Sequence, residues 1–341
     1  MSFSLSDFDY YLPDAQIAHT PTERRDKSKL LKYNKLTKEV SDHTFDEFSD
    51  LIPNNSVIVF NNTKVLKARV ICYRESGAKI ECFFLKKISE KRWEVIIKNS
   101  RRISNNETLI IDKKNSIKVI EKKDKCAIVC IKSNMEDFEF LENFGKTPLP
   151  PYIKTKDPDK FHERYQSIFA SNPGAVAAPT ASLHFTDKIF SQLKSKNIEI
   201  LYVTLHIGLG TFNPITKENI IDHKMHKENY SITKSTAAKL NQAKKEKKPI
   251  FAVGTTVARC LESNIKDNLF SEQTTDTDLY IFPGYEYKGI DGLLTNFHLP
   301  KSSLFILVAA MIGLKNIQDI YQHAIEHDYR FFSFGDAMLI S

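Results

Sequence analysis

The chain has 341 residues, a length that favours about two domains at roughly 150 residues each. Hydrophobic residues make up 41% and charged residues 27%, which excludes a wholly disordered chain. Five cysteines without a CxxC pair argue against a disulfide scaffold and favour a cytoplasmic location. We expect neither a signal peptide nor a membrane span, because the N-terminus lacks a basic segment and the longest apolar run covers only residues 304–314.

The net charge of +7 is unevenly distributed. Residues 63–157 carry 22 basic and 13 acidic side chains, a net +9, whereas the rest carries 27 basic and 29 acidic ones. Such a basic segment favours a phosphate-rich partner such as nucleic acid. The alternative is a lysine-rich, solvated surface without a partner.

The first clear element in the chain is an apolar strand at residues 57–60. Short β-branched segments without helical periodicity follow it at residues 67–74, 79–85, 93–97, 108–112, 116–121 and 126–131. They predict a small all-β domain, a barrel or a sandwich, which ends at the stiff, proline-rich residues 148–152. We therefore expect a basic barrel domain at residues 64–157, inserted into an α/β domain formed by residues 1–63 and 158–341.

Strands and helices alternate after the insert. We expect helices at residues 186–196, 234–247, 257–264, 303–314 and 317–327, and strands at residues 198–206 and 250–253. This βα alternation predicts the α/β class, with a largely parallel, partial-barrel-like sheet.

Two glycine-containing loops are candidate ligand sites. Gly254, Thr255 and Thr256 lie between a strand and a helix, where free backbone N–H groups and the helix dipole would attract a phosphate or carboxylate. The threonines could instead only cap the helix. Gly208 and Gly210 lack the third glycine of a dinucleotide fingerprint, so they indicate a loop that a ligand approaches closely.

Histidines mark three further segments. His223, His226 and Glu228 resemble metal ligands, but on a strand His226 and Glu228 would instead share a face with Tyr230 and could exchange protons. Residues 178–186 and 295–303 are polar loops that enter helices, where α/β proteins often bind ligands. Their candidate contacts are Thr180, His184, Phe297 and His298.

Several segments together resemble one family, the S-adenosylmethionine:tRNA ribosyltransferase-isomerases of queuosine biosynthesis. The matching segments occur in family order at residues 8–31, 59–70, 174–186, 203–214, 223–230, 253–263, 282–308 and 329–340. The resemblance therefore covers essentially the whole chain.

The resemblance implies that S-adenosylmethionine donates its ribosyl group to 7-aminomethyl-7-deazaguanine at the wobble position of tRNA. Isomerisation then gives epoxyqueuosine, and adenine and methionine leave. The implied partners are S-adenosylmethionine, as a consumed co-substrate, and tRNA that carries the precursor in its anticodon. The resemblance implies no cofactor, metal or membrane, and we expect a monomer.

Residue roles follow from this resemblance as hypotheses. His226 and Glu228 form the preferred acid/base pair, assisted by Tyr230 and by His184 or His206. Expected substrate contacts are Asn62, Thr180, Gly208, Gly210, Gly254, Thr255, Thr256, Arg259, Tyr285, Phe297 and His298. Expected tRNA contacts in the insert are Lys86, Lys87, Arg101 and Arg102.

The chain departs from the family pattern at a few positions. Asn62 stands where the family has Asp, so Asn62 is expected to contact a ligand by hydrogen bonds rather than to act as a base. The other departures are conservative: Lys29, Lys64, Ser182 and Phe334. Two alternative functions remain open, a non-catalytic RNA-binding protein and a metal-dependent hydrolase that uses His223, His226 and Glu228.

Overall fold

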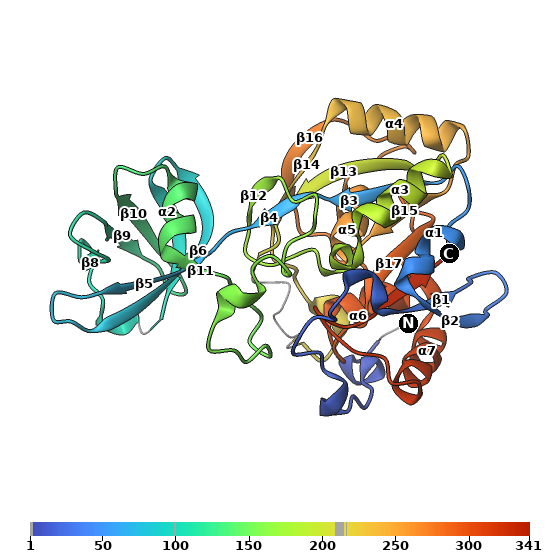
Figure 1. The fold of residues 1–341 in the computed structure, drawn as a ribbon, viewed down its shortest axis with the longest axis horizontal. Coiled ribbons are helices and arrows are strands. Elements are labelled where there is room, and N and C mark those ends of the chain that lie inside the picture. Colours follow the sequence, from blue (N-terminus) through green and yellow to red (C-terminus); the bar gives the residue numbers. More distant parts are fainter. Residues whose placement is uncertain (1–2, 99, 209–214, 216) are drawn as a thin grey trace.

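The structure is a computed structural model that describes residues 3–98, 100–208, 215 and 217–341. Figure 1 shows a large α/β body and a small β-barrel that lies to one side of it. The chain passes from the body into the barrel next to β4 (Thr63–Val65) and pairs again with β4 through β12 (Asn172–Ala175).

A nine-stranded sheet runs through the body in the order β16-β14-β13-β3-β15-β17-β18-β1-β2. Its strands are β1 (Lys29–Tyr33), β2 (Val40–Thr44), β3 (Val57–Asn61), β13 (Glu199–Leu205), β14 (Glu228–Ile232), β15 (Ile250–Val253), β16 (Gln273–Thr277), β17 (Gly292–Asn296) and β18 (Ala337–Ile340). Strands β13, β3, β15 and β17 are parallel neighbours at the centre, and β1 is parallel to β18. The other neighbouring strands of the sheet are antiparallel.

The two faces of this sheet belong to two hydrophobic cores. Along β3, Val57 and Val59 enter one core, whereas Ile58 and Phe60 enter the other, as the alternation of side chains in a strand requires. The helices of the body are α1 (Phe48–Leu51), α3 (Asp187–Ser195), α4 (Lys234–Lys245), α5 (Thr255–Asn264), α6 (Ser303–Ile312) and α7 (Leu314–Glu326). Helices α4 to α7 contribute to the first core, and α1 and α3 to the second.

The insert forms a closed antiparallel barrel. Its sheet has the order β11-β5-β6-β7-β10-β9-β8, and an additional pairing of β5 with β8 closes it. Its strands are β5 (Arg69–Tyr73), β6 (Lys79–Ser89), β7 (Arg92–Ile97), β8 (Thr108–Ile110), β9 (Ser116–Lys122), β10 (Ala127–Lys132) and β11 (Gly145–Lys146). Helix α2 (Asp137–Phe144) packs Phe140 and Leu141 into the barrel core beside Trp93.

The expected α/β class with an inserted β-barrel is confirmed. The sheet, however, is mixed rather than largely parallel, because β14, β16, β18 and β2 each pair with a neighbour in the antiparallel direction. Helix α5 begins at Thr255 rather than at residue 257, because Gly254 itself is the N-cap residue. Among the described residues no single helix is long and apolar enough to cross a membrane; α6 and α7 pass that test only as a pair bent by 114°.

Gly292 in β17 lies where two strands approach closely. A Cβ atom at this position would lie 2.2 Å from Cε1 of Phe251 and 2.9 Å from the backbone oxygen of Ile340. We therefore expect Gly292→Ala to lower the free energy of unfolding by about 1–3 kcal/mol through overpacking. Denaturant unfolding measures this, with Leu36→Ala at a 93% exposed position as a control that should change little. An unchanged stability in Gly292→Ala would contradict the packing described here.

Candidate active site

A cavity of about 500 Å³ lies at one edge of the central strands. Its walls come from chain segments far apart in sequence, namely residues 178–181, 254–256, 295–302 and 332–333, together with Tyr152, Ile207, Ile215 and Leu304. A more open hollow of about 670 Å³ lies on the barrel and is lined by residues of β8, β9, β10 and their turns. We regard the first cavity as the candidate active site, because the polar loops identified in the sequence meet there.

Parallel pairing explains why two of these loops are neighbours. Strands β15 and β17 are aligned in parallel, so the chain leaves both at the same edge of the sheet. After β15, Gly254 turns the chain with a φ of 93°, a conformation that favours glycine, and α5 begins at once. After β17, the loop reaches Ser302, whose hydroxyl caps α6 by accepting a hydrogen bond from the N–H of Phe305 at 3.2 Å.

The first turns of α5 and α6 both contribute to the cavity wall. Thr255, Thr256 and Ser302 line the cavity, so the N-terminal ends of two helices are close to any bound ligand. Such ends carry partial positive charge and free N–H groups, which favour a carboxylate or phosphate. No side-chain hydrogen bond caps α5, so the expectation that Thr255 or Thr256 is an ordinary cap is wrong.

His184 lies behind the wall of the cavity. Its Nδ1 is 2.7 Å from Oγ of Ser28, its Nε2 is 3.2 Å from Nδ2 of Asn296, and its ring stacks on Phe45. Burial, with a smaller contribution from nearby arginines, lowers the pKa of His184 to about 3. Asn296 in turn accepts a hydrogen bond from Thr180 at 2.7 Å, and both residues line the cavity. His184 is therefore a neutral residue that positions the wall, and it does not reach the cavity itself.

Phe297 and His298 form an aromatic wall. Phe297 is buried among Tyr321, Tyr329 and Phe331, with ring centroids 5.1–5.4 Å away. His298 keeps part of its surface open, and its Nε2 lies 2.8 Å from Oγ1 of Thr295. Burial lowers the pKa of His298 to about 3, so its imidazole is neutral at physiological pH. A neutral imidazole can donate one hydrogen bond and accept another.

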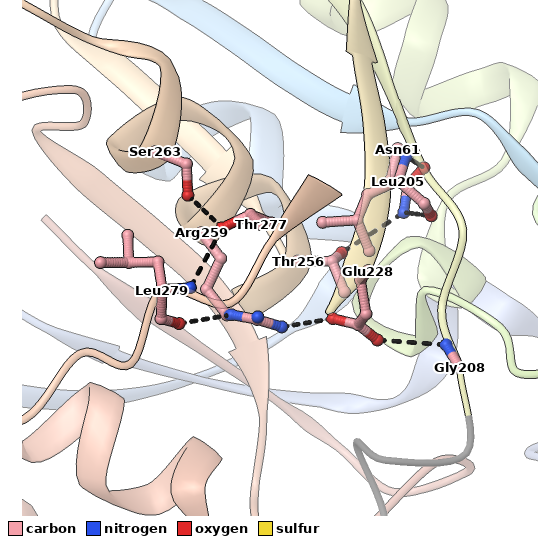
Figure 2. A network of polar contacts seen from close by, with 9 residues as sticks. All are labelled: Asn61, Leu205, Gly208, Glu228, Thr256, Arg259, Ser263, Thr277 and Leu279. Atoms are coloured by element: carbon pink, nitrogen blue, oxygen red, sulfur yellow. Dashed lines mark hydrogen bonds and ion pairs between the residues drawn. The ribbon is translucent and has the colours of Figure 1, made fainter. Parts of the chain in front are cut away.

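Glu228 forms a buried ion pair with Arg259 (Figure 2). Its carboxylate accepts a hydrogen bond from Nη1 of Arg259, and the two side chains are only 4% and 3% exposed. Nε of Arg259 donates to the backbone oxygen of Leu279 at 3.0 Å, and the N–H of Gly208 donates to Oε1 of Glu228 at 3.1 Å. The pair thus fixes the chain next to Ile207, which lines the cavity. Gly210 lies outside the described residues.

The expected row of His226, Glu228 and Tyr230 is only partly formed. Glu228 and Tyr230 share the buried face of β14, whereas His226 precedes the strand and is exposed. The hydroxyl of Tyr230 donates to Oε1 of Gln273 at 2.9 Å, within the core. His223, His226 and Glu228 do not form a group of metal ligands in the described part of the chain.

Other expected contacts lie outside the cavity. Nδ1 of His206 is 2.8 Å from Oγ1 of Thr63. Asn62 accepts hydrogen bonds from Asn172 and Thr204 beside a separate hollow of about 250 Å³. Tyr285 donates to Oε2 of Glu262 at 3.1 Å.

The expected tRNA contacts of the barrel differ in their surroundings. Lys87 pairs with the buried Asp137 at 2.7 Å, and Lys86 lies 3.8 Å from Asp276 of the body. Arg101 and Arg102 are exposed.

Sequence reasoning missed part of the cavity wall. Tyr152 and Ser333 line it and are joined because the tyrosine hydroxyl donates to Oγ of the serine and accepts from its N–H. The proline-rich context of Tyr152 indicated only a connector. A contact between residues 181 positions apart leaves no local pattern that could have revealed it.

Comparison with known proteins identifies the family. The model of the family described as "Queuosine biosynthesis protein" matches residues 5–340. The chain belongs to this family. It is 44% identical to the S-adenosylmethionine:tRNA ribosyltransferase-isomerases of Sulfurihydrogenibium sp. and Carboxydothermus hydrogenoformans, over 98% of this chain and 99% of each relative. The crystal structure of S-adenosylmethionine tRNA ribosyltransferase from Thermotoga maritima matches with a TM-score of 0.57 and 30% identity, covering 98% of this chain and 100% of the other.

The buried pair of Glu228 and Arg259 makes a strong prediction about stability. Glu228→Gln should lower the free energy of unfolding by about 3–5 kcal/mol, because it leaves the Arg259 guanidinium buried without a countercharge. A double variant, Glu228→Gln with Arg259→Met, should recover much of that loss. Urea unfolding compares both with Asp319→Asn, which breaks an exposed pair with Lys315 and should cost less than about 1 kcal/mol. Equal losses in the buried and exposed variants would refute the assignment.

The lowered pKa of His184 predicts how the free energy of unfolding depends on pH. Its pKa is about 3 in the folded chain and about 6.5 when unfolded, so below about pH 6.5 the unfolded state binds a proton that the folded state does not. The contribution of neutral, buried His184 to the free energy of unfolding is complete above that pH. It is lost as the pH falls, at up to about 1.4 kcal/mol per pH unit. Unfolding of His184→Gln should therefore depend less steeply on pH between 6.5 and 4. An identical slope in both proteins would exclude this role for His184.

Proposed function

We propose that this chain is an S-adenosylmethionine:tRNA ribosyltransferase-isomerase, the activity named for its relatives. One observation carries the proposal: the polar loops at residues 178–181, 254–256 and 295–302, far apart in sequence, line one cavity of about 500 Å³. A cavity of this size suits a nucleoside-sized ligand. S-adenosylmethionine would be consumed as the ribosyl donor, so the proposed reaction needs no additional cofactor.

The chemistry of the cavity wall supports a zwitterionic, sulfonium-containing ligand. The N-terminal turns of α5 and α6 suit the methionine carboxylate. The aromatic wall at Phe297 and His298 suits a purine ring or a sulfonium, which aromatic surfaces attract. The backbone at Gly254 allows a ligand to approach closely.

The sequence favoured His226 and Glu228 as the acid/base pair, but the lining of the cavity favours a different residue for proton transfer. The described lining residues include no aspartate or glutamate, and Glu228 is committed to Arg259. The neutral imidazole of His298 lies at the wall, where it can accept one hydrogen bond and donate another, so it can relay a proton as adenine leaves or as the ribosyl group rearranges. We therefore propose His298 as the proton-transfer residue and Glu228 with Arg259 as the pair that positions the wall beside it.

The barrel supplies the proposed contact with tRNA. The segment that contains it carries the net +9, which suits the phosphates of an anticodon arm. An enzyme that acts on a nucleobase must take the base out of its stack, so the 7-aminomethyl-7-deazaguanine is proposed to reach the cavity as an unstacked base.

The decisive experiment is an adenine-release assay. Purified protein with S-adenosylmethionine and tRNA that carries 7-aminomethyl-7-deazaguanine should release adenine and add the ribosyl mass to the tRNA. The matched control is the same tRNA with guanine at the wobble position, which should give no release. Tight tRNA binding without adenine release would favour the alternative of a non-catalytic RNA-binding protein.

Two histidine variants separate the proposed roles. His298→Gln should lower kcat by about 10²–10⁴-fold, the usual contribution of a positioned acid or base, while tRNA affinity is retained. The His226→Ala variant tests the pair favoured by the sequence, because His226 is exposed and does not line the cavity. A full rate in His298→Gln together with a large loss in His226→Ala would reverse the assignment.

Two exposed arginines of the barrel give a prediction about salt dependence. The double variant Arg101→Gln and Arg102→Gln should weaken tRNA binding and reduce the slope of log K against log salt by about one unit per lost phosphate contact. Lys87→Gln is the matched control, because Lys87 pairs with Asp137 and should affect the stability of the barrel rather than the slope. Fluorescence anisotropy across a salt titration measures both, and an unchanged slope would place tRNA elsewhere.

A further inference from the structure

A second cluster of chemically versatile side chains lies outside the cavity. Asp42, His323 and His327 each offer a metal-ligating atom, and these atoms all lie within 4.8 Å of one another. Among the described residues it is the only such group of histidine, cysteine and carboxylate side chains. None of the three lines the cavity, and the proposed function uses none of them.

The fold brings these residues together from the two ends of the chain. Asp42 lies on β2, the edge strand of the nine-stranded sheet, where it pairs with Leu31 of β1. His323 is in the last turn of α7, and His327 is the C-cap residue of that helix. Residues four apart on a helix share one face, so the two imidazoles are neighbours, with ring centroids 3.9 Å apart and planes inclined by 20°.

Hydrogen bonds orient all three groups. Nε2 of His323 lies 2.9 Å from Oδ2 and 3.1 Å from Oδ1 of Asp42. Nδ1 of His327 lies 2.8 Å from the backbone oxygen of His323, so Nδ1 carries the proton and Nε2 carries the lone pair. The hydroxyl of Tyr329 donates to Oδ1 of Asp42 at 2.5 Å. Such outer hydrogen bonds to a histidine and a carboxylate are typical of metal sites, because they fix the tautomer and the orientation of the ligands.

The local charge also favours a cation. The carboxylate of Asp42 faces Nε2 of His323, and a bound cation would take the place of the single proton that these two groups share. The ammonium of Lys29 is close by, but it donates to the backbone oxygens of His327 at 2.6 Å and Asp328 at 3.2 Å. Its charge is thus partly offset by the C-terminal carbonyls of α7.

We propose that Asp42, His323 and His327 bind a divalent transition-metal cation of the zinc class. Two imidazole nitrogens and one carboxylate oxygen suit Zn²⁺, Co²⁺ or Ni²⁺, whereas Mg²⁺ and Ca²⁺ prefer oxygen ligands alone. The cation takes its remaining ligands from water, because the cluster is partly exposed. It joins the edge strand β2 to the end of α7 and so holds together elements from both ends of the chain.

The cation would also stabilise one wall of the active-site cavity. Tyr329 donates to Asp42 with its hydroxyl, and its ring packs at 5.4 Å against Phe297, a cavity residue. The role is structural, so the test does not depend on the ribosyltransferase activity.

Calorimetric titration of the tag-free, full-length protein with Zn²⁺ tests the proposal. The expected result is one saturable site that His327→Gln and Asp42→Asn each weaken by more than about tenfold, with Tyr329→Phe losing about tenfold through the lost outer hydrogen bond. His43→Gln is the matched control, because His43 neighbours Asp42 on β2 but pairs with Glu47 at 3.0 Å. Its affinity should equal that of the wild type.

A second set of measurements distinguishes this site from Zn²⁺ binding by cysteine thiols and detects variants that are misfolded. Co²⁺ should give visible d–d absorption in the wild type and in His43→Gln, and none in His327→Gln. Zn²⁺ should raise the Tm of the wild type but not that of His327→Gln, since only a ligand of the folded state stabilises it. Absent Zn²⁺ binding, or binding that is equal in His327→Gln and the wild type, would overturn the proposal.

Discussion

The parallel alignment of β15 with β17 is the constraint on which the cavity depends. It places Gly254 and the loop after Asn296 at the same edge of the sheet, and each loop then starts a helix. Had the two strands been antiparallel, these loops would lie at opposite edges and could not share a ligand. The mixed sheet therefore has three adjacent parallel pairs at its centre, where they position the loops, and its outermost pairs, β16 with β14 and β1 with β2, are antiparallel.

Local pattern was sufficient to predict the elements with strong periodicity. The β-branched barrel strands and the central strands β3, β13 and β15 are close to their expected positions, whereas the central strand β17 was not foreseen. The edge strand β2 and the helix α2 were not foreseen, because VSDHT is polar and DFEFLENF, although amphipathic, has only eight residues, too few for a clear helical period. The mixed character of the sheet was also missed, since pairing direction depends on partners that are distant in sequence.

In the candidate site, too, residues with a local sequence pattern could be predicted, whereas contacts between residues distant in sequence could not. Gly254, Thr180 and His298 could be identified because glycine turns and polar residues before a helix have a local signature. The partnership of Glu228 with Arg259 could not, because it joins a strand to a helix across 31 positions. Likewise, the sequence predicted a catalytic role for His184, but both of its ring nitrogens are hydrogen-bonded, to Ser28 and Asn296. These contacts form only in the folded chain, so the sequence pattern could not reveal them.

The two ends of the barrel meet in a single pair of strands. β5, where the barrel begins, pairs with β11, where it ends, so that Arg69 lies opposite Lys146. An insertion whose entry and exit adjoin in this way places little geometric demand on its host. The loops and surface of the barrel can therefore change in sequence while the cavity of the α/β body is left undisturbed.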